Sequence, residues 1–325
     1  MPISRRHLLA ATPALLLGRL TCVEAATNFP SRTVKILVPY APGGPADILA
    51  RILGEQPALS LGRAFVVENL GGAGGNIGMG QGARAAADGY TLLVVPPNVV
   101  VNPAMYDTVP YEPYRQFQPI SVAVTAPTVL TVHPSVEAAT VKELVELIRT
   151  NPGKFSFASP GTGTPPHLIG EQFRLVLGLD LVHVPFNSAG QAVGSTLAGH
   201  TPLAFTSLPP AVPLVQDGKI RALAVTSPTR SAVLPDVPTM AEQGYPAIEG
   251  EGWFALIAPS GVPKDIVDLL FRETAKALQQ SAVQDKLKAL GFDIVCKSPE
   301  ASATLFRLEG EKWARVISAA RIRAD

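Results

Sequence analysis

The chain has 325 residues, with 27 basic and 26 acidic side chains and a formal net charge of +1. This near-neutral balance lacks the basic excess that binding to a phosphate backbone needs, so we expect no nucleic-acid partner. Hydrophobic residues make up 47% and charged residues 16% of the chain, which indicates a folded protein with a large core and excludes a disordered one.

The first 25 residues have the layout of an export signal. Arg5 and Arg6 precede a mostly apolar stretch over residues 8–20, and small residues follow up to Ala25. The apolar stretch falls short of the roughly 20 residues that a membrane helix needs. The two arginines resemble a twin-arginine motif, but adjacent arginines also occur in ordinary secretory signals, so both export routes stay open. We therefore expect a periplasmic protein.

Cysteine and histidine give no sign of a disulfide or a metal centre. Cys22 lies in the signal, which leaves Cys296 alone and predicts that it packs as a small apolar side chain. The sequence has no His-Glu-x-x-His, Cys-x-x-Cys or phosphate-loop motif. A formal dinucleotide fingerprint at Gly78 follows a glycine-rich loop instead of a strand, and we interpret it as chance. We expect no metal and no cofactor.

The first elements alternate strand, glycine loop and helix. A β-branched run at 33–38 precedes a turn at 39–45 and a helix whose apolar positions start at Ile48. Such alternation predicts a mostly parallel sheet with helices on both faces. The same series continues with a strand at 64–67, a glycine-rich loop at 71–75, a helix reaching Ala87 and a strand at 91–95.

A second series follows Pro119. Residues 120–132 form a long extended segment, and Thr140 with Glu143 forms a capping box that starts an amphipathic helix. The series then repeats with a strand at 154–158, the loop Gly161-Thr162-Gly163-Thr164, and a helix from Pro165 to about Gly178.

The last third of the chain decides the domain organisation. If its two final helices pack on the first lobe, the chain crosses twice between lobes, as a hinged binding protein requires. This predicts a first lobe of residues 26–126 plus 252–325 and a second lobe of residues 127–251. The elements expected here are strands at 181–185, 202–206, 220–226 and 253–258 and helices at 264–281 and 298–320.

Two glycine loops, one in each predicted lobe, are candidate ligand sites. Both precede a helix, whose first N–H groups lack partners and carry partial positive charge. The first loop is Pro42-Gly43-Gly44-Pro45, and the second, residues 159–164, adds the hydroxyls of Ser159, Thr162 and Thr164. Neither contains Lys or Arg, so recognition of a small carboxylate would rest on neutral dipoles. Each loop alone could instead only shape a tight turn.

Two titratable residues near these loops have alternative roles. Asp47 would be the third residue of its helix, where a carboxylate stabilises the N-terminus, and a contact with ligand also stays open. His167 lies near the start of the second helix and is the histidine we single out, although a backbone carbonyl would satisfy it equally well. An alternative is a hydrolase that uses Ser159 or Thr164 with His167 as base.

Several motifs in one order resemble a known family over essentially the whole mature chain. They resemble the Bug, or TctC-type, extracytoplasmic solute receptors of tripartite tricarboxylate transport systems. The motifs are Thr33–Asp47, Val66–Gly78, Asp88–Leu92, Ala158–Leu168, His183–Phe186, Gly218–Ser227, Leu234–Thr239 and Trp253–Pro259.

The resemblance implies a type II periplasmic binding protein fold, with two α/β lobes, a hinge of two crossovers and a cleft that closes on a small carboxylate. Relatives often carry Gly, Thr or Ser where this chain has Pro45 and Ala46, and hydroxyl-rich residues where it has Pro96 and Pro97, which leaves the ligand's identity open. The resemblance implies contacts on the segments 42–47, 159–167 and 186–189 and around Asn98 and Thr206. The individual residues expected from the loops and the resemblance together are Tyr40, Pro42, Gly43, Gly44, Asp47, Asn98, Ser159, Gly161, Thr162, Gly163, Thr164, His167, Phe186, Asn187 and Thr206.

The sequence therefore predicts a non-catalytic, monomeric receptor for a small carboxylate. Its partners would be membrane subunits of a tripartite tricarboxylate-type transporter or a sensor kinase, and the sequence does not separate transport from sensing. The hydrolase is the less favoured alternative, because no third residue that would orient the histidine is apparent.

Overall fold

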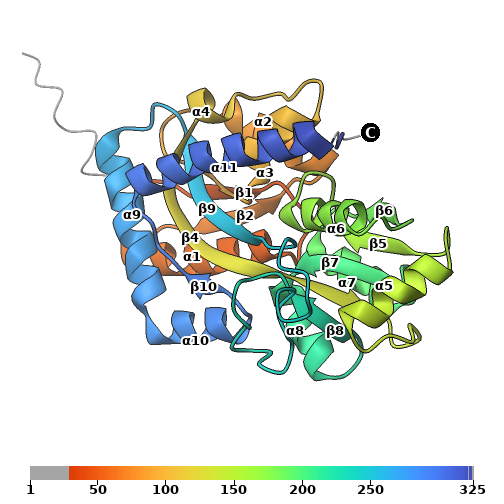
Figure 1. Ribbon diagram of the computed structural model, residues 1–325. Helices are drawn as coiled ribbons and strands as arrows, with labels where there is room; N and C mark the ends of the chain where they lie inside the picture. The colour runs from red at the N-terminus through yellow and green to blue at the C-terminus, as the bar shows by residue number, and fades with distance from the viewer. Residues whose placement is uncertain (1–28, 321, 324–325) are drawn as a thin grey trace, which may run out of the picture.

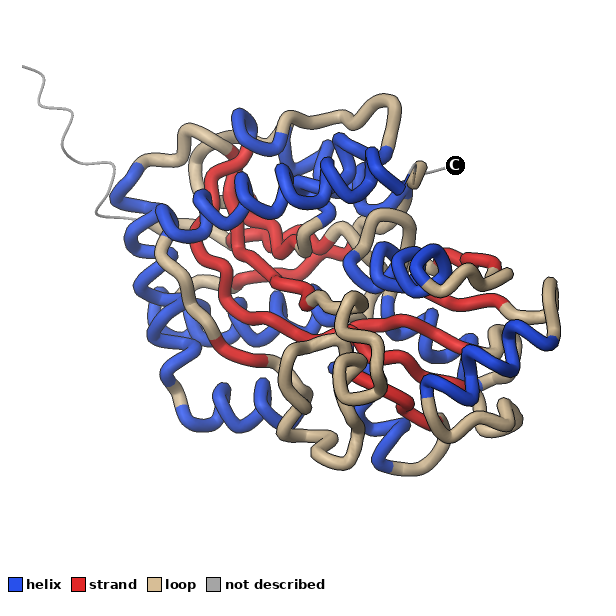
Figure 2. The backbone as a smooth tube through the Cα atoms, in the orientation of Figure 1, coloured by secondary structure: helices blue, strands red, loops and turns tan. Residues whose placement is uncertain are grey.

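Two α/β lobes form the molecule, which is a computed structural model that describes residues 29–320, 322 and 323 (Figure 1). The predicted export signal, with Cys22, lies outside the described residues. Both lobes are built on one sheet of ten strands, and one long strand, β4 (Phe117–Val132), continues from one lobe into the other (Figure 2). The predicted fold class is confirmed, while the residue boundaries of the two lobes stay a prediction.

Lobe 1 is built on the strand order β2-β1-β3-β9-β4. β1 pairs in parallel with β2 and β3, but β9 is antiparallel to both of its neighbours, β3 and β4. Within lobe 1, the expected parallel pairing is therefore found in β1, β2 and β3 and not in β9, because the returning β9 enters the sheet in the opposite direction. The elements of lobe 1 are β1 (Val34–Val38), α1 (Pro45–Leu61), β2 (Phe65–Asn69), η2 (Ala73–Gly75), α2 (Asn76–Ala83), β3 (Thr91–Val95), α3 (Asn98–Met105), α4 (Pro113–Gln116), the first part of β4 (Phe117–Val132), β9 (Glu251–Pro259), α9 (Lys264–Gln279), α10 (Ser281–Ala289), β10 (Asp293–Ile294) and α11 (Pro299–Ala320).

Lobe 2 is built on the end of β4 and the strands β5 to β8. β5 pairs in parallel with β6 and β7, whereas β4 runs antiparallel to β7 and β8. Its elements are α5 (Val141–Thr150), β5 (Ser156–Ser159), α6 (Pro165–Val176), β6 (Val182–Pro185), α7 (Ala189–Leu197), β7 (Leu203–Ser207), α8 (Leu208–Gln216) and β8 (Arg221–Val225).

The two lobes are joined by two neighbouring crossings. β4, the long yellow strand in Figure 1, pairs with β9 as far as Pro127 and with β7 from Thr128 onward. The chain returns at Gly250, whose N–H donates to the carbonyl of Thr226 at 3.0 Å, and Glu251 then pairs with Pro127. Both crossings thus lie at one place, which suits a hinge.

Alternating side chains give each lobe cores on both faces of its sheet. Ile36 and Leu37 are consecutive in β1 and pack into different apolar clusters, because successive strand residues point to opposite faces. In lobe 2, Leu130 and Val129 of β4 separate in the same way. Helices cover the faces and leave the strand ends free for a site.

Local sequence explains where the main helices begin. The predicted cap of Thr140 is present, since its hydroxyl accepts from the Glu143 N–H at 3.2 Å. The Glu143 carboxylate reaches back one residue further than in a standard capping box and accepts from the Ala139 N–H at 2.7 Å. α1 begins at Pro45 after Gly44, and α6 at Pro165 after Thr164, both with proline at the first position.

Some helices differ from the sequence prediction. The helix expected over 264–281 ends at Gln279, and a separate helix, α10, follows it. The short helices α3, α7 and α8 are also additional to the prediction. Among the described residues, none of the helices is both long and apolar enough to cross a membrane.

Candidate functional site

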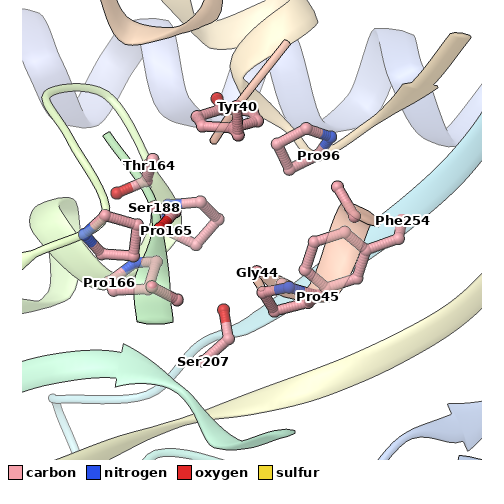
Figure 3. Close-up of a pocket in the computed structure, with 14 residues that line it drawn as sticks. Tyr40, Gly44, Pro45, Pro96, Thr164, Pro165, Pro166, Ser188, Ser207 and Phe254 are labelled. Atoms are coloured by element: carbon pink, nitrogen blue, oxygen red, sulfur yellow. The ribbon is translucent and has the colours of Figure 1, made fainter. Parts of the chain in front are cut away.

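A cavity lies between the two lobes, next to the hinge (Figure 3). The space within it, with its open mouth included, is about 420 Å³. Both lobes contribute to its wall, and none of its lining residues carries a charged side chain. The lining residues are Tyr40, Gly44, Pro45, Ala46, Pro96, Gly252 and Phe254 from lobe 1 and Pro160, Thr164, Pro165, Pro166, Ser188, Ala189 and Ser207 from lobe 2.

The first turns of α1 and α7 meet at one edge of this cavity. A Cβ on Gly44 would lie 3.7 Å from the Ser188 Cβ and 3.8 Å from the Ala189 nitrogen. The Ala41 N–H also donates across the lobes to the carbonyl of Asn187 at 3.1 Å. We call this meeting point, formed by residues 44–46 and 188–190, the polar edge.

The polar edge holds hydrogen-bond donors that the protein itself leaves unused. Within the described residues, no protein acceptor bonds to the backbone N–H groups of Ala46, Ala189 or Gly190. These are first-turn positions, where N–H groups have no partner inside the helix. The positive ends of two helices therefore point at the same part of the cavity, an arrangement that favours an anionic group.

Two serine hydroxyls add to these donors. Ser188 accepts from the Gln191 N–H at 3.2 Å, which leaves its hydroxyl proton free. Ser207 precedes α8 but makes no capping bond, and its hydroxyl points into the cavity in Figure 3. Thr164 differs, because its hydroxyl already donates to the Gly161 carbonyl at 2.7 Å and accepts from the His167 N–H.

The start of α6 offers the cavity apolar surface instead of donors. Its first two residues, Pro165 and Pro166, have no N–H, and the next N–H, of His167, is bonded to Thr164. The sequence predicts a dipole site at this helix as at α1. The structure instead presents proline rings there, and the donors come from α7.

Three of the residues expected from the sequence, Tyr40, Gly44 and Thr164, line the cavity. Four further lining residues, Pro96, Pro160, Ser188 and Ser207, lie within two positions of residues that the sequence singles out. The expected residues that lie outside its wall are Pro42, Gly43, Asp47, Asn98, Ser159, Gly161, Thr162, Gly163, His167, Phe186, Asn187 and Thr206.

Asp47 is engaged within lobe 1. Its carboxylate accepts from the Gly43 N–H at 3.1 Å and from the Asn69 amide at 3.0 Å. It also accepts from Nε and Nη2 of the Arg51 guanidinium. Burial alone would raise the pKa of Asp47, but these hydrogen bonds outweigh it and lower the pKa. The carboxylate thus stays ionised and organises the loop before α1.

Asn98 and Gly163 lie where the lobes touch behind the cavity. The Asn98 amide nitrogen is 3.5 Å from the Thr162 carbonyl. A Cβ on Gly163, whose φ is +81°, would lie 2.6 Å from the Asn102 Oδ1. The lobes are therefore closed on one another, and glycine is needed for this approach. Asn98 Oδ1 and the Thr206 hydroxyl are buried without a hydrogen-bond partner in the described chain.

Two of the histidines of lobe 2, His167 and His183, form a separate cluster outside the wall of this cavity. The rings of His167 and His183 lie 4.1 Å apart, and Ser159 Oγ is 2.7 Å from His183 Nε2. Burial lowers the pKa of His183 to about 4 and that of His167 well below its usual value. They line a second cavity, which Glu171 and Arg174 share.

This cluster does not have the arrangement expected for a hydrolase. Ser159 is fully buried and bonds to His183, not to His167, whose Nδ1 accepts from the Gly163 N–H at 3.1 Å. Across the residues that the structure describes, no group of three or more His, Cys, Asp or Glu side chains could hold a metal ion.

Comparison with known proteins gives consistent matches. Residues 49–322 match the profile of the tripartite tricarboxylate transporter family receptor. The chain is 35% identical to Protein BugT of Bordetella pertussis over 90% of each chain.

Solved structures agree with this match. The periplasmic binding protein BugD has a TM-score of 0.88 and 35% identity, covering 91% of this chain and 100% of its own. Rpa4515 of R. palustris, solved with adipate, has a TM-score of 0.88 and 31% identity, covering 91% and 99%. MatC from Rhodopseudomonas palustris, with bound malate, has a TM-score of 0.85 and 30% identity, covering 89% and 100%.

Proposed function

Because the chain belongs to the tripartite tricarboxylate transporter receptor family, we propose that it binds a small carboxylate between its lobes for a transporter of that kind. The observation that carries the proposal is the polar edge, where the first turns of α1 and α7 direct unused N–H groups into one cavity. Adipate and malate, the ligands of the two relatives, are both carboxylates.

Neutral donors suit a receptor that must release its ligand. Several N–H and hydroxyl groups stabilise a carboxylate through directed hydrogen bonds, without the full charge of a lysine or arginine. The lobes close around the ligand about the hinge, and membrane subunits would recognise the closed form. In this proposal the receptor has no catalytic step and is exported to the periplasm, by the twin-arginine or the general secretory route.

The proposal assigns residue ranges to the two lobes and names the groups that contact the ligand. Lobe 1 would comprise residues 26–126 with 252–325, and lobe 2 residues 127–251. The proposed first contacts are the N–H groups of Ala46 and Ala189 with the hydroxyls of Ser188 and Ser207. The expected residues around the cavity, such as Asp47, Asn98 and Gly163, would hold the loops and the closed lobes in position.

The test uses residues 26–325, unfolded and refolded to remove any bound solute. Thermal unfolding is measured with a panel of mono-, di- and tricarboxylates and with the primary amides of the same acids. A bound acid at 100 times its Kd should add about 2.7 kcal/mol of stability, and its amide should add far less. If no acid stabilises the refolded protein, or if amides do so equally, the proposal fails.

One variant locates the binding at the polar edge. Ala189→Pro removes a single N–H at the first position of α7, where proline is well tolerated, so the fold should persist and affinity should fall. Ser281→Pro makes the same change at the exposed first position of α10 and should leave affinity unchanged. Equal affinity in both variants would remove α7 from the site.

A further inference from the structure

We infer that the preferred ligand is an apolar monocarboxylate, with one carboxylate at the polar edge and an uncharged ring or branched body in the rest of the cavity. This inference rests on the proposed function and narrows it to a substrate class. It differs from the dicarboxylates adipate and malate, which the two relatives hold.

The donors of the cavity are concentrated at one edge. The starts of α1 and α7 lie within about 4 Å of each other. Their N–H groups can therefore bond to a single carboxylate but not to two carboxylates at opposite ends of a ligand. Ser188 belongs to the same edge, and Ser207 points into the cavity toward it (Figure 3). One carboxylate can therefore use most of the free donors.

The remaining wall cannot hold a second carboxylate well. Five of the lining residues are prolines, which have no N–H, and two of them occupy the first turn of α6. The Tyr40 hydroxyl is already used, since it donates to the Gly74 carbonyl at 3.2 Å. A carboxylate buried against such a wall would lose its hydration without gaining hydrogen bonds or a counter-charge.

Aromatic and proline rings give the wall the shape of an apolar pocket. Phe254 of β9 is 4% exposed, and its ring lies across the cavity from Pro165 and Pro166 in Figure 3. Pro96 lies beside Phe254 on the same side. Flat apolar groups pack well against such rings. Burial of an apolar part of the ligand here would therefore increase affinity, whereas a second carboxylate at the same place would reduce it.

The experiment compares matched acids by calorimetry on the refolded chain of residues 26–325. Benzoate and cyclohexanecarboxylate represent the apolar monocarboxylates, and adipate and malate represent the dicarboxylates. At least one apolar acid should bind tenfold or more tightly than both dicarboxylates. If a dicarboxylate binds as tightly or more tightly, this inference falls and the proposed function stands; if no acid binds, both fall.

Two variants test the wall itself. Phe254→Ala should weaken binding of the apolar acid by about tenfold or more, whereas Phe271→Ala, a partly buried change on α9 outside the cavity, should not. Pro165→Ala restores an N–H at the first position of α6 and should improve adipate binding relative to the apolar acid. Pro299→Ala makes the same change at α11 and should alter neither affinity. Unchanged ligand preference in Phe254→Ala and Pro165→Ala would contradict the assignment of this wall.

Discussion

Asp47 shows how a residue in a binding loop can serve the loop and not the ligand. The carboxylate has four hydrogen bonds from three partners, all within lobe 1, and it does not line the cavity. The sequence leaves capping and ligand contact open for this residue, and the geometry favours a positioning role.

We predict that Asp47→Asn costs about 1–3 kcal/mol of stability at pH 7, because a buried charged acceptor is lost. The pKa of Asp47 is lowered in the folded protein, so its stabilisation is present above the unfolded value near 4 and disappears as pH falls through the folded value. Urea unfolding at pH 7 and pH 3 should show the difference shrinking at the lower pH.

The control for this change is Asp107→Asn, because the Asp107 side chain is 95% exposed and should contribute little at either pH. Ligand affinity of Asp47→Asn, measured at pH 7, should stay within about threefold of the unchanged protein. A complete loss of binding in a folded variant would instead place the carboxylate in contact with the ligand.

At the residue scale, motifs identify the loops of the site but not which side chain points inward. The sequence singles out Thr206, yet Ser207 lines the cavity, because adjacent strand residues face opposite sides. Ser188, the N-cap of α7, lines the cavity beside the expected Asn187. Which of two adjacent residues points into the cavity depends on the direction of the backbone at the end of the strand. Sequence composition and motif spacing do not reveal that direction.

Among the elements, α5 is the helix that its own sequence explains best. The capping bonds of Thr140 and Glu143 are present, and the apolar face over Val141–Ile148 packs into lobe 2. We predict that Thr140→Ala lowers the stability of the protein by about 1 kcal/mol, since a helix cap is removed. Chemical denaturation should show the loss.

Ligand affinity should not change in Thr140→Ala, because α5 lies outside the cavity. Thr150→Ala, at the other end of the same helix, is the matched control and should cost less, since its hydroxyl caps no helix N–H: it donates to carbonyls of its own helix and accepts from the exposed Asn151 amide. A loss of affinity in Thr140→Ala would mean that α5 is coupled to closure of the lobes.

Long, patterned elements were predictable and short ones were not. The strands β1, β3, β4 and β9 and the long helices follow from β-branched runs, apolar periodicity and caps. α3, α7 and α8 have only eight or nine residues and contain proline, glycine or valine, so their helical form depends on packing against the sheet. The sequence places the segment 186–189 at the site but does not predict that α7 begins there, so the first-turn N–H groups of this helix could not be identified from the sequence.

At the scale of the whole molecule, the lobes are held closed by close backbone approaches at glycine. We predict that Gly163→Ala weakens ligand binding at least about tenfold, because its Cβ would meet Asn102 of the other lobe only in the closed form. Calorimetry with the bound acid would measure this effect.

Gly244→Ala is the matched control for backbone strain. Gly244 has φ +91° against +81° for Gly163, and a Cβ there would meet nothing within 4 Å. Both variants should lose a similar small amount of stability, and only Gly163→Ala should lose affinity. Equal affinities in the two variants would show that the contact with Asn102 does not govern closure.

The position of β9 also sets the order in which the chain can complete its fold. β9 separates β3 from β4, although it follows them in the chain only after all of lobe 2. Lobe 2 can therefore assemble from a nearly continuous stretch, while lobe 1 keeps two unpaired strand edges until residues 251–259 arrive. A chain truncated before Glu251 would therefore keep the strands of lobe 2 but leave two strand edges of lobe 1 open to pairing with other chains.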